Sequence, residues 1–290
     1  MANIREIHSR MKSIKDIMKI TNAMYLISSS KLKKARKSLL ATQPYFEGLQ
    51  STIHDILIRT PHMHQVFFER REEIKPGFRK EGYIVITADK GLAGAYNHNV
   101  IKRAEEEMQK SKKNFLFVIG QVGRQYFLRK GVEIECEFLY TAQNPTLYRA
   151  QLISETIIEM FEKGELDDVY VIFNKMITPM KSEVQFRRIL PLERRKFDRR
   201  KEGYQHAIFE PSPEEVMNKL VPNYLKGYIF GVLVEAFSSE QNARMTAMEA
   251  ATSSAKDMLR ELDLQYNRAR QASITQEITE IVSGAKSLKK

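Results

Sequence analysis

Seam positions recur at alternating intervals along the C-terminal part of the chain, with spacings of three, four and seven residues between them. This rhythm is the heptad seam of a coiled coil. No proline occurs from Asn223 to Ser287, so the pattern predicts a continuous helix of roughly 95 Å at 1.5 Å of rise per residue. A helix of that length requires a coiled-coil partner or serves as a shaft. The seam positions are Val234, Gln241, Met245, Met248, Thr252, Ala255, Leu259, Leu262 and Tyr266.

The N-terminal part has the same rhythm up to its first proline, Pro44. A second long helix is therefore expected to pair with the first. Small or polar residues thin both seams, namely Thr21 and Ser28 in one and Ser238, Gln241 and Thr252 in the other, which indicates moderate rather than maximal adhesion. The apolar seam residues of the N-terminal helix are Ile4, Ile7, Met11, Ile14, Met18, Tyr25, Leu32 and Leu39.

The C-terminal seam changes phase after Ala269. The apolar positions move to Ile274, Ile278, Ile281 and Ala285. A continuous partner helix would have to unwind or overwind locally to follow them. More simply, the partner helix ends there.

Between the two helices the period shortens to that of strands separated by helical stretches. Such alternation predicts βαβ units around a largely parallel sheet. Four strands are expected at Gly82–Ala88, Asn114–Gly120, Glu133–Tyr140 and Asp167–Phe173, with helices at Asn97–Gln109, Gln121–Arg129 and Leu147–Glu162. A fifth strand, Glu183–Leu190, follows a short turn at Thr178-Pro179 and is expected to be an antiparallel edge.

The predicted fold class therefore combines α/β and α+β features. It is an antiparallel coiled coil of long N- and C-terminal helices with a central Rossmann-like α/β insert. We expect three parts: an N-terminal coiled-coil helix over residues 1–60, a Rossmann-like domain over 75–205, and a C-terminal coiled-coil helix over 212–287.

Composition narrows the class of protein. The formal charge of +11 predicts an acidic partner surface, whether nucleic acid, anionic lipid or a protein loop. The single cysteine, Cys136, excludes an internal disulfide framework and is expected to be a core thiol in phase with Ile134 and Phe138 in a reducing compartment. No apolar run reaches the ~18 residues of a membrane span, and the first twenty residues lack the apolar centre of a signal peptide.

Several candidate sites have weak support. GLAGAYN after the first strand, with Gly91 and Gly94, fits neither the dinucleotide fingerprint nor the phosphate-loop pattern, so a plain strand-to-helix turn is favoured. The same objection applies to Gly-Ala-Lys-Ser at 284–287. His62-Met-His64 lacks acidic or cysteine companions at metal-binding spacing. We therefore expect no cofactor and no metal.

A basic run beside Pro191 is expected to be a mobile loop, and binding to an acidic partner is the alternative. The run comprises Arg194, Arg195, Lys196, Arg199, Arg200 and Lys201.

Longer motifs resemble a known family. KITNAMYLISSSKLKKA (19–35), EAFSSEQNARMTAMEAAT (235–252) and NRARQASITQEITEIVSGA (267–285) are similar to the terminal motifs of the γ subunit of F-type ATP synthases. ITADKGLAGAYN (86–97) and VYVIFNKMI…ILPLE (169–193) extend the resemblance through the insert. Ala93 and Ala95 depart from the residues common there, and the insert lacks the regulatory cysteine segment of chloroplast members, so no thiol switch is expected.

The resemblance implies a central rotor shaft with no active site of its own. Such a shaft turns inside a hexamer of α and β subunits, and its asymmetric faces drive the β subunits through their nucleotide states. The implied partners are the α and β subunits, the small ε subunit of the stalk and the membrane ring of c subunits, with no nucleic acid. The implied location is the cytoplasmic face of the cell membrane, as a peripheral part of a bacterial-type complex.

The resemblance also assigns candidate contacts to β loops. Met24 is expected near an acidic loop of β, and Lys19 is expected to share that surface. Packing is the simpler role for Met24, and a solvated helix face for the charged residues. The remaining expected contacts to β loops are Arg244, Arg270, Gln271, Thr275 and Glu277.

Two other functions stay open at this point. A nucleic-acid-binding coiled coil would fit the charge, but aromatic residues interleaved with a basic stripe are missing from the sequence. A nucleotide-dependent enzyme in the insert would fit the sheet, but its phosphate loop is missing.

Overall fold

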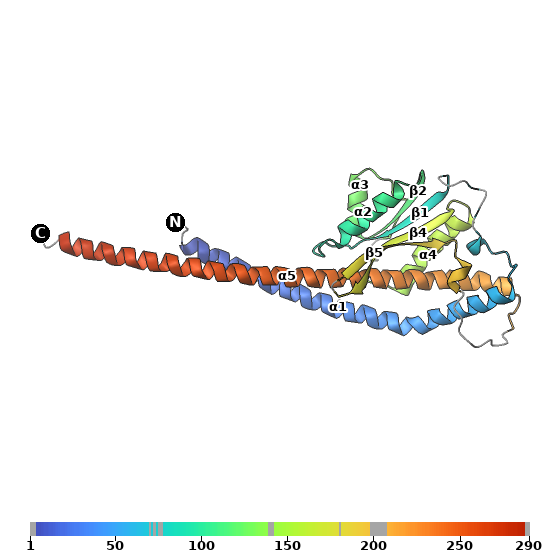
Figure 1. Ribbon diagram of the computed structural model, residues 1–290, viewed down its shortest axis with the longest axis horizontal. Coiled ribbons are helices and arrows are strands. Elements are labelled where there is room, and N and C mark those ends of the chain that lie inside the picture. The colour runs from blue at the N-terminus through green and yellow to red at the C-terminus, as the bar shows by residue number, and fades with distance from the viewer. Residues whose placement is uncertain are drawn as a thin grey trace. The chain divides into compact units, whose positions relative to one another are not determined.

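The computed structural model describes residues 4–69, 71, 74, 78–138, 142–179, 181–197 and 208–287 (Figure 1). Along the chain, one long helix precedes an α/β segment and a second long helix follows it. The elements are α1 (Ile4–Arg59), the 3₁₀ turn η1 (Val66–Phe68), β1 (Lys80–Ile86), α2 (Tyr96–Met108), β2 (Lys113–Ile119), α3 (Gln121–Arg129), β3 (Cys136–Phe138), α4 (Leu147–Glu162), β4 (Asp168–Thr178), β5 (Lys181–Leu190), the 3₁₀ turn η2 (Arg194–Phe197) and α5 (Pro213–Ser287).

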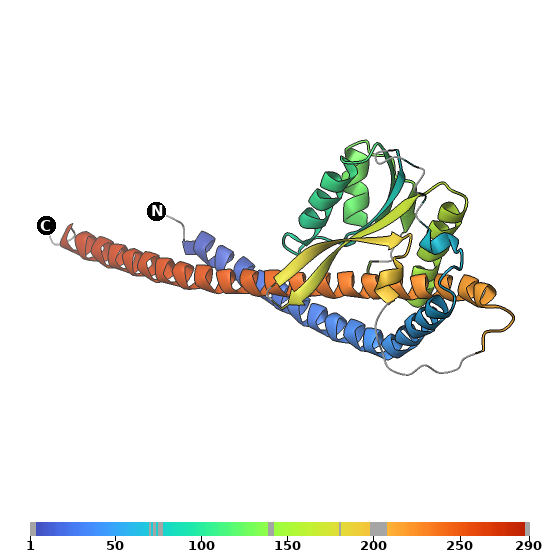
Figure 2. The ribbon, with the colours of Figure 1, turned by 45° about the vertical axis from the view of Figure 1, so that its right-hand side comes forward.

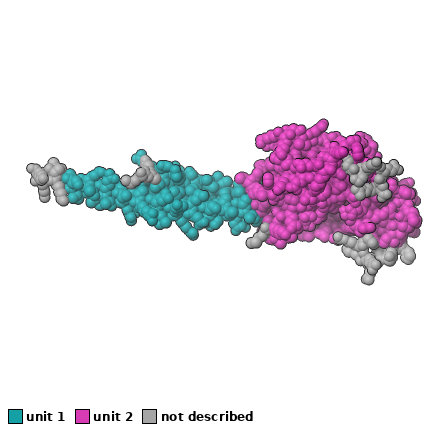
Figure 3. All heavy atoms as spheres, turned by 45° about the horizontal axis from the view of Figure 1, so that its top comes forward, with its two compact units in different colours: residues 1–28, 244–290 teal, residues 29–243 magenta. Residues whose placement is uncertain are grey.

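The chain forms two compact units, coloured separately in Figure 3. We call residues 1–28 with 244–290 the smaller unit, and residues 29–243 the larger unit. Helices α1 and α5 each contribute residues to both. The three-part division expected above is a different partition of the chain and stays a prediction.

In the smaller unit α1 and α5 pair in opposite directions. The His8 and Tyr266 rings lie 6.3 Å apart between centroids, and the Thr21 and Thr252 hydroxyl oxygens lie 2.7 Å apart. Residue numbers therefore rise along one helix as they fall along the other. The predicted seam is confirmed, because its buried positions include Ile7, Met11, Thr21, Ser28, Met248 and Ala255.

The two threonines account for part of the polar seam. Thr252 donates to the Met248 carbonyl at 2.8 Å, and Thr21 lies within hydrogen-bond distance of the Met18 carbonyl at 3.1 Å. Because each hydroxyl has a single hydrogen, Thr252 donates within its own helix and accepts from Thr21 across the seam. A polar pair of this kind fixes the register of two helices while contributing less apolar burial than a leucine pair.

The larger unit contains a five-stranded sheet in the order β3-β2-β1-β4-β5. The first four strands in this order are parallel, and β5 is antiparallel to β4. Helices α2 and α3 cover one face and α4 the other (Figures 1 and 2). The Rossmann-like insert with an antiparallel edge is therefore confirmed.

Both faces of the sheet are buried, as is usual for a parallel sheet between helices. Along β1 the side chains alternate: Tyr83 and Val85 pack toward α2 and α3, whereas Ile84 and Ile86 face the larger core. That larger core combines α4, β-strand residues and segments of α1 and α5. It holds Ile53 of α1, Phe161 of α4 and Leu233 of α5.

Two prolines lie inside the long helices. Helix α1 continues past Pro44 to Arg59, and α5 begins at Pro213 and contains Pro222. Proline removes one backbone hydrogen bond and bends a helix, and Figure 2 shows α1 bent along its length. Packing of Ile53 and Ile56, both fully buried, keeps the last part of α1 helical after the proline.

The third strand begins later than the sequence pattern predicts. Among the described residues, Cys136–Phe138 pairs with Phe117–Ile119 of β2, and the Glu135 backbone N–H before the strand donates to the Leu116 carbonyl at 2.9 Å. Ile134 lies before the strand and packs in the core on the α2 side, whereas Cys136 and Phe138 pack against the other core. Cys136 is half-buried rather than fully buried, because β3 is the edge of the sheet. Leu139 and Tyr140, at the end of the expected strand, lie outside the described residues.

A buried ionic cluster joins the start of β4 to the segment before β1. Arg79 pairs with Asp168, and both side chains are almost fully buried. Arg71 pairs with Asp167 at 2.9 Å, and the other oxygen of Asp167 accepts the backbone N–H of Lys80 at 2.8 Å. The cluster fixes the position at which the chain enters the sheet.

Candidate partner-binding surfaces

Four of the seven predicted contact residues lie near the end of α5. Arg270, Gln271, Thr275 and Glu277 are exposed. The Thr275 hydroxyl donates to the Gln271 carbonyl within the helix at 2.9 Å. Every described side chain from Ile274 to Ala285 is exposed, including four large apolar ones: Ile274, Ile278, Ile281 and Val282. The phase change after Ala269 therefore coincides with the end of the buried seam.

Lys19 and Met24 lie on α1 in the smaller unit. Lys19 is exposed and donates to the Asp16 carboxylate at 2.9 Å, which lowers the pKa of Asp16. Met24 is half-buried, beside the seam position Tyr25. The two residues therefore differ in availability: the Lys19 ammonium is open to a partner, and Met24 offers part of its side chain.

Arg244 differs from the other six because it is buried, with 8% of its surface exposed. It lies on α5 near the seam residues Gln241 and Met248, which are also buried. A buried guanidinium is hydrogen-bonded or paired wherever proteins tolerate it. The structure therefore favours an orienting role for Arg244 over a freely presented charge.

The sequence pattern overlooked a second set of apolar residues on α1. Ile17, Ile20, Leu26 and Ile27 are between 52% and 60% exposed. These four residues do not occupy seam positions. The sequence could have indicated this surface, because large apolar residues on the outer face of a predicted coiled coil are unusual. Clusters of exposed apolar side chains mark interaction surfaces in soluble proteins.

Positive charge is concentrated on the same helix. Between residues 4 and 40 the acidic residues are Glu6 and Asp16 alone. The basic residues of this stretch are all exposed: Arg5, Arg10, Lys12, Lys15, Lys19, Lys31, Lys33, Lys34, Arg36 and Lys37. A stretch of one sign attracts an acidic surface and speeds association with it.

Within the described residues, α5 covers the position that doubly wound sheets use for ligands. In such folds ligands bind beyond the carboxyl ends of the strands, where the strand order reverses, here between β1 and β4. Helix α5 occupies that position: the Tyr96 hydroxyl donates to the Ala236 carbonyl at 3.1 Å, and Ala243 packs against Ala88 and Ala93. The chain's own helix thus fills the space that a nucleotide would need.

The turn after β1 has the structure of a plain strand-to-helix connection. Gly94 adopts a left-handed conformation with φ of 56°, which glycine accepts without strain. Asn97 caps the turn by accepting the Ala88 backbone N–H at 2.8 Å. The simpler interpretation of GLAGAYN therefore agrees with the structure. Gly284 to Ser287 lies within α5.

The candidate metal pair His62 and His64 lies outside any cluster of metal-binding side chains among the described residues. His64 is exposed and contacts Glu69 at 2.9 Å, while Met63 beside it is buried. Within the described part of the chain no three His, Cys, Asp or Glu side chains gather as a metal site would require.

The basic run is ordered where it is described. Arg194 donates to the Pro61 and Met63 carbonyls at 2.9 and 2.6 Å, so the expected mobile loop is wrong for residues 194–197, which form η2. These bonds join the strand end to the end of α1. Arg199, Arg200 and Lys201 lie outside the described residues.

Among the described helices, none has an apolar stretch of the length and hydropathy needed to cross a lipid bilayer.

The fold and surfaces define a class: a chain with two long antiparallel helices that carry exposed apolar and basic residues, and with a Rossmann-like insert between them in the sequence. The comparisons agree with this class. The family model described as ATP synthase matches residues 3–288. The ATP synthase gamma chain of Acetivibrio thermocellus is 48% identical over 300 residues, covering 100% of both chains. That of Ruminiclostridium cellulolyticum is 49% identical over 292 residues, covering 99% of both.

A solved chain of the Euglena gracilis mitochondrial ATP synthase has the same fold, with a TM-score of 0.65 at 14% identity, covering 98% of this chain and 94% of the other. The protein belongs to the ATP synthase gamma-chain family. As the family naming implies, it is a non-catalytic subunit of the ATP synthase complex.

Proposed function

We propose that the paired helices of the smaller unit turn inside a hexamer of α and β subunits and contact acidic loops of β. The observation that carries this proposal is the end of α5, where every described side chain from Ile274 to Ala285 is exposed and four are large and apolar. Such a surface is unfavourable in water and favours a surrounding sleeve.

Six of the seven predicted contacts act in two groups under this proposal. Lys19, Met24 and the basic face of α1 meet an acidic β loop, and Arg270, Gln271, Thr275 and Glu277 meet loops that hold the end of α5. Arg244 orients the helix from a buried position. Many weak surface contacts suit a rotor, because exposed ion pairs contribute about 0–1 kcal/mol each and exchange readily.

The insert serves as the foot of the stalk, joining the ε subunit and the membrane ring of c subunits at the cytoplasmic face of the cell membrane. Its support is the closed crevice between β1 and β4, which leaves the insert a scaffold for protein contacts. The c-subunit ring, rather than this chain, sets the coupling ion. Co-sedimentation of the chain with ring-containing membranes, with and without ε, tests this part. Failure to co-sediment under both conditions would contradict it.

Reconstitution with purified α and β subunits tests the shaft. The intact chain is expected to assemble and to support rotation driven by ATP hydrolysis. A chain ending at Ala272 is expected to assemble but to deliver less torque, and a chain ending at Ser287 is the matched control with unchanged torque. If the intact chain neither assembles nor changes the ATPase activity, the shaft proposal is wrong.

A charge reversal tests the β-loop contact on α1. Lys19→Glu is expected to weaken assembly by about two- to fivefold, the range of an exposed ion pair. Lys163→Glu on α4 is the matched control, because Lys163 is likewise exposed and paired to a carboxylate of its own helix, Glu159 at 2.6 Å. Equal effects from both changes would argue against a specific role for Lys19.

A further inference from the structure

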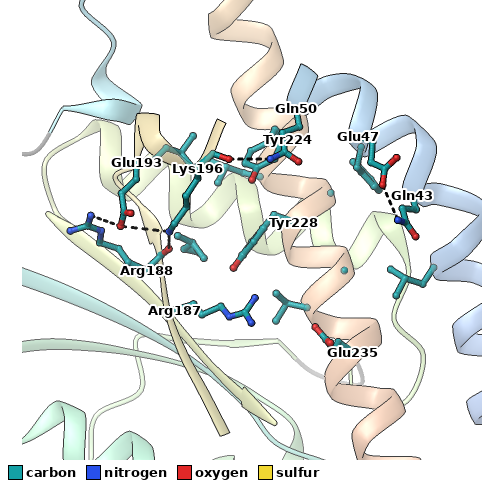
Figure 4. Close-up of a pocket in the computed structure, with 18 of the residues that line it drawn as sticks. Gln43, Glu47, Gln50, Arg187, Arg188, Glu193, Lys196, Tyr224, Tyr228 and Glu235 are labelled. Carbon is teal, nitrogen blue, oxygen red and sulfur yellow. Dashed lines mark hydrogen bonds and ion pairs between the residues drawn. The ribbon is translucent and has the colours of Figure 1, made fainter. Parts of the chain in front are cut away.

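The larger unit contains a cavity of about 880 Å³ that neither the closed crevice nor the helical pair of the smaller unit explains. Three elements of the larger unit enclose it: α1 on one side, β5 with η2 on another, and α5 as the floor (Figure 4). Its volume falls within the range of about 300–1,000 Å³ that is typical of small-molecule sites.

The floor of the cavity is apolar and flat. Helix α5 contributes two glycines one turn apart, Gly227 and Gly231. The Phe46 ring of α1 lies directly on Gly227, so that a Cβ there would come within 1.9 Å of it. At Gly231 an added Cβ would meet nothing within 4 Å, so the space above it is open. Leu225 and Val232 complete the floor.

The wall facing this floor is cationic. It contains Arg187 and Arg188 of β5, with Arg195 and Lys196 of η2. Figure 4 shows the Arg187 side chain reaching from the strand toward α5, between Tyr228 and Glu235. The Arg187 guanidinium stacks over the Phe173 ring at 5.7 Å and donates to Gln185 at 3.1 Å. Because a guanidinium has five N–H donors, it retains capacity for an anion.

The acidic residues around the cavity do not cancel this wall. Glu193 pairs with Arg188 at 2.7 Å and with Lys196 at 3.6 Å, and Glu235 pairs with Lys175 at 3.2 Å. Glu47 accepts the Gln43 amide on the α1 side. The basic side chains in and beside the wall, Lys175, Arg187, Arg188, Arg195 and Lys196, therefore outnumber these three carboxylates.

The phenol of Tyr228, beside Arg187, adds an uncharged hydrogen-bond donor. Burial raises the pKa of Tyr228, and the Arg187 charge and hydrogen bond only partly oppose that rise. The hydroxyl therefore stays protonated at neutral pH and is able to donate to an anion held by the guanidinium.

We propose that this cavity binds a small amphipathic anion, with its apolar group on the Phe46, Gly231 and Val232 floor and its carboxylate, sulfonate or phosphate on Arg187 and Tyr228. The proposal does not depend on the shaft function, because it concerns a site within the larger unit of the chain itself. A ligand there would contact α1, β5 and α5 together and would stabilise their packing.

The test uses 1-anilinonaphthalene-8-sulfonate and its uncharged analogue N-phenyl-1-naphthylamine, titrated into the purified full chain and followed by fluorescence and calorimetry. The chain contains no tryptophan, so dye emission is read without that background. We expect one saturable site for the sulfonate and weaker binding of the neutral analogue. Arg187→Gln is expected to weaken sulfonate binding by about tenfold and to leave the analogue unchanged.

Filling the cavity gives the second variant. Gly231→Leu places a side chain in the open space and favours the helix, so folding is retained. It is expected to abolish saturable dye binding. Gly284→Leu, the same change at an open position near the end of α5, is the matched control and is expected to bind as the unmodified chain does.

Three results would overturn the proposal. One is unchanged binding to Gly231→Leu, and another is an equal loss in Gly284→Leu, which would place the dye on exposed apolar surface elsewhere. The third is loss of dye binding when the intact chain is assembled with the other subunits of the complex, because a protein segment would then be the occupant.

Discussion

The two units differ in how many large apolar side chains they bury. In the larger unit the fully buried positions include large aromatic and branched residues such as Tyr83, Phe117, Phe161 and Phe173. In the smaller unit the buried positions include Thr21, Ser28 and Ala255, whereas large apolar side chains such as Ile20 and Ile281 are exposed. The larger unit thus completes its own core, and the smaller unit leaves apolar surface for a partner.

This difference teaches how a stalk subunit divides its stability. Burial of large apolar side chains contributes about 1.5–3 kcal/mol each, so the larger unit supplies most of the folding free energy. A thin helical seam contributes less and opens at lower cost. Under the proposed shaft function, a well-packed larger unit and a thinly packed smaller unit that is completed by its surroundings are both of use.

The largest expected effect comes from the buried ion pair of the larger unit. Arg79→Met leaves the Asp168 carboxylate without its buried partner and is expected to cost about 3–5 kcal/mol of unfolding free energy. The double variant with Asp168→Leu is expected to be more stable than the single one, because it removes both buried charges. Urea unfolding followed by circular dichroism measures both, and additive losses in the double variant would show that the pair is not coupled.

The contact between α1 and α5 in the larger unit is the next target. Gly227→Ala forces the Phe46 ring to move and is expected to destabilise by about 1–3 kcal/mol through overpacking. Gly231→Ala, four residues along the same helix, meets no neighbour and is expected to be neutral or to gain up to about 1 kcal/mol. Thermal unfolding compares the two, and equal melting temperatures would contradict the close packing at Gly227.

A substitution in the seam of the smaller unit is expected to raise the unfolding free energy rather than lower it. Replacing both threonines, as Thr21→Val with Thr252→Val, removes a satisfied hydroxyl pair and adds apolar burial. We expect a gain of about 0–1 kcal/mol, seen as slower amide hydrogen exchange in residues 4–28 and 244–266. Exchange in the larger unit serves as the internal control. Faster exchange in the seam would mean that the hydroxyl pair stabilises the helices more than methyl groups do.

The smallest effect on stability is expected at the end of α5. Ile278→Ser changes a side chain that is 57% exposed, so the free energy of unfolding should shift by less than about 0.5 kcal/mol. Self-association of the isolated chain, measured by sedimentation velocity, should nevertheless fall, since an exposed apolar group is removed. A large loss of stability would show that Ile278 packs within the chain and would erase the contrast between the two units.

Much of the architecture was predictable because it depends on local patterns. The heptad positions predicted both long helices, and α3 and α4 have the expected bounds. Tertiary packing overrides a local rule at Pro44: α1 continues through the proline to Arg59, within the expected helix of residues 1–60, because Ile53 and Ile56 are buried beyond it. At the sheet edge, the described part of β3 begins at Cys136 rather than at Glu133, where its pairing with Phe117 of β2 starts.

The surfaces divide in the same way. The motifs near the ends of the chain placed five of the seven candidate contacts at exposed helix positions, whereas Met24 is half-buried and Arg244 is buried. The exposed apolar residues on α1 could be read from the sequence, but the heptad pattern did not distinguish them as a second surface beside the seam. The basic turn at Arg194 was expected to be mobile because its carbonyl partners, Pro61 and Met63, are more than a hundred residues away in the chain.

By itself the sequence determined the helical seams, the βαβ insert, the excess of positive charge and the family motifs, because each is set by residue type at short spacing. Only the tertiary structure decided that α5 closes the crevice beside Tyr96, that Arg79 meets Asp168, and that a cationic cavity lies between α1, β5 and α5. Those features join residues far apart in the chain, and their positions depend on how the helices pack against the sheet.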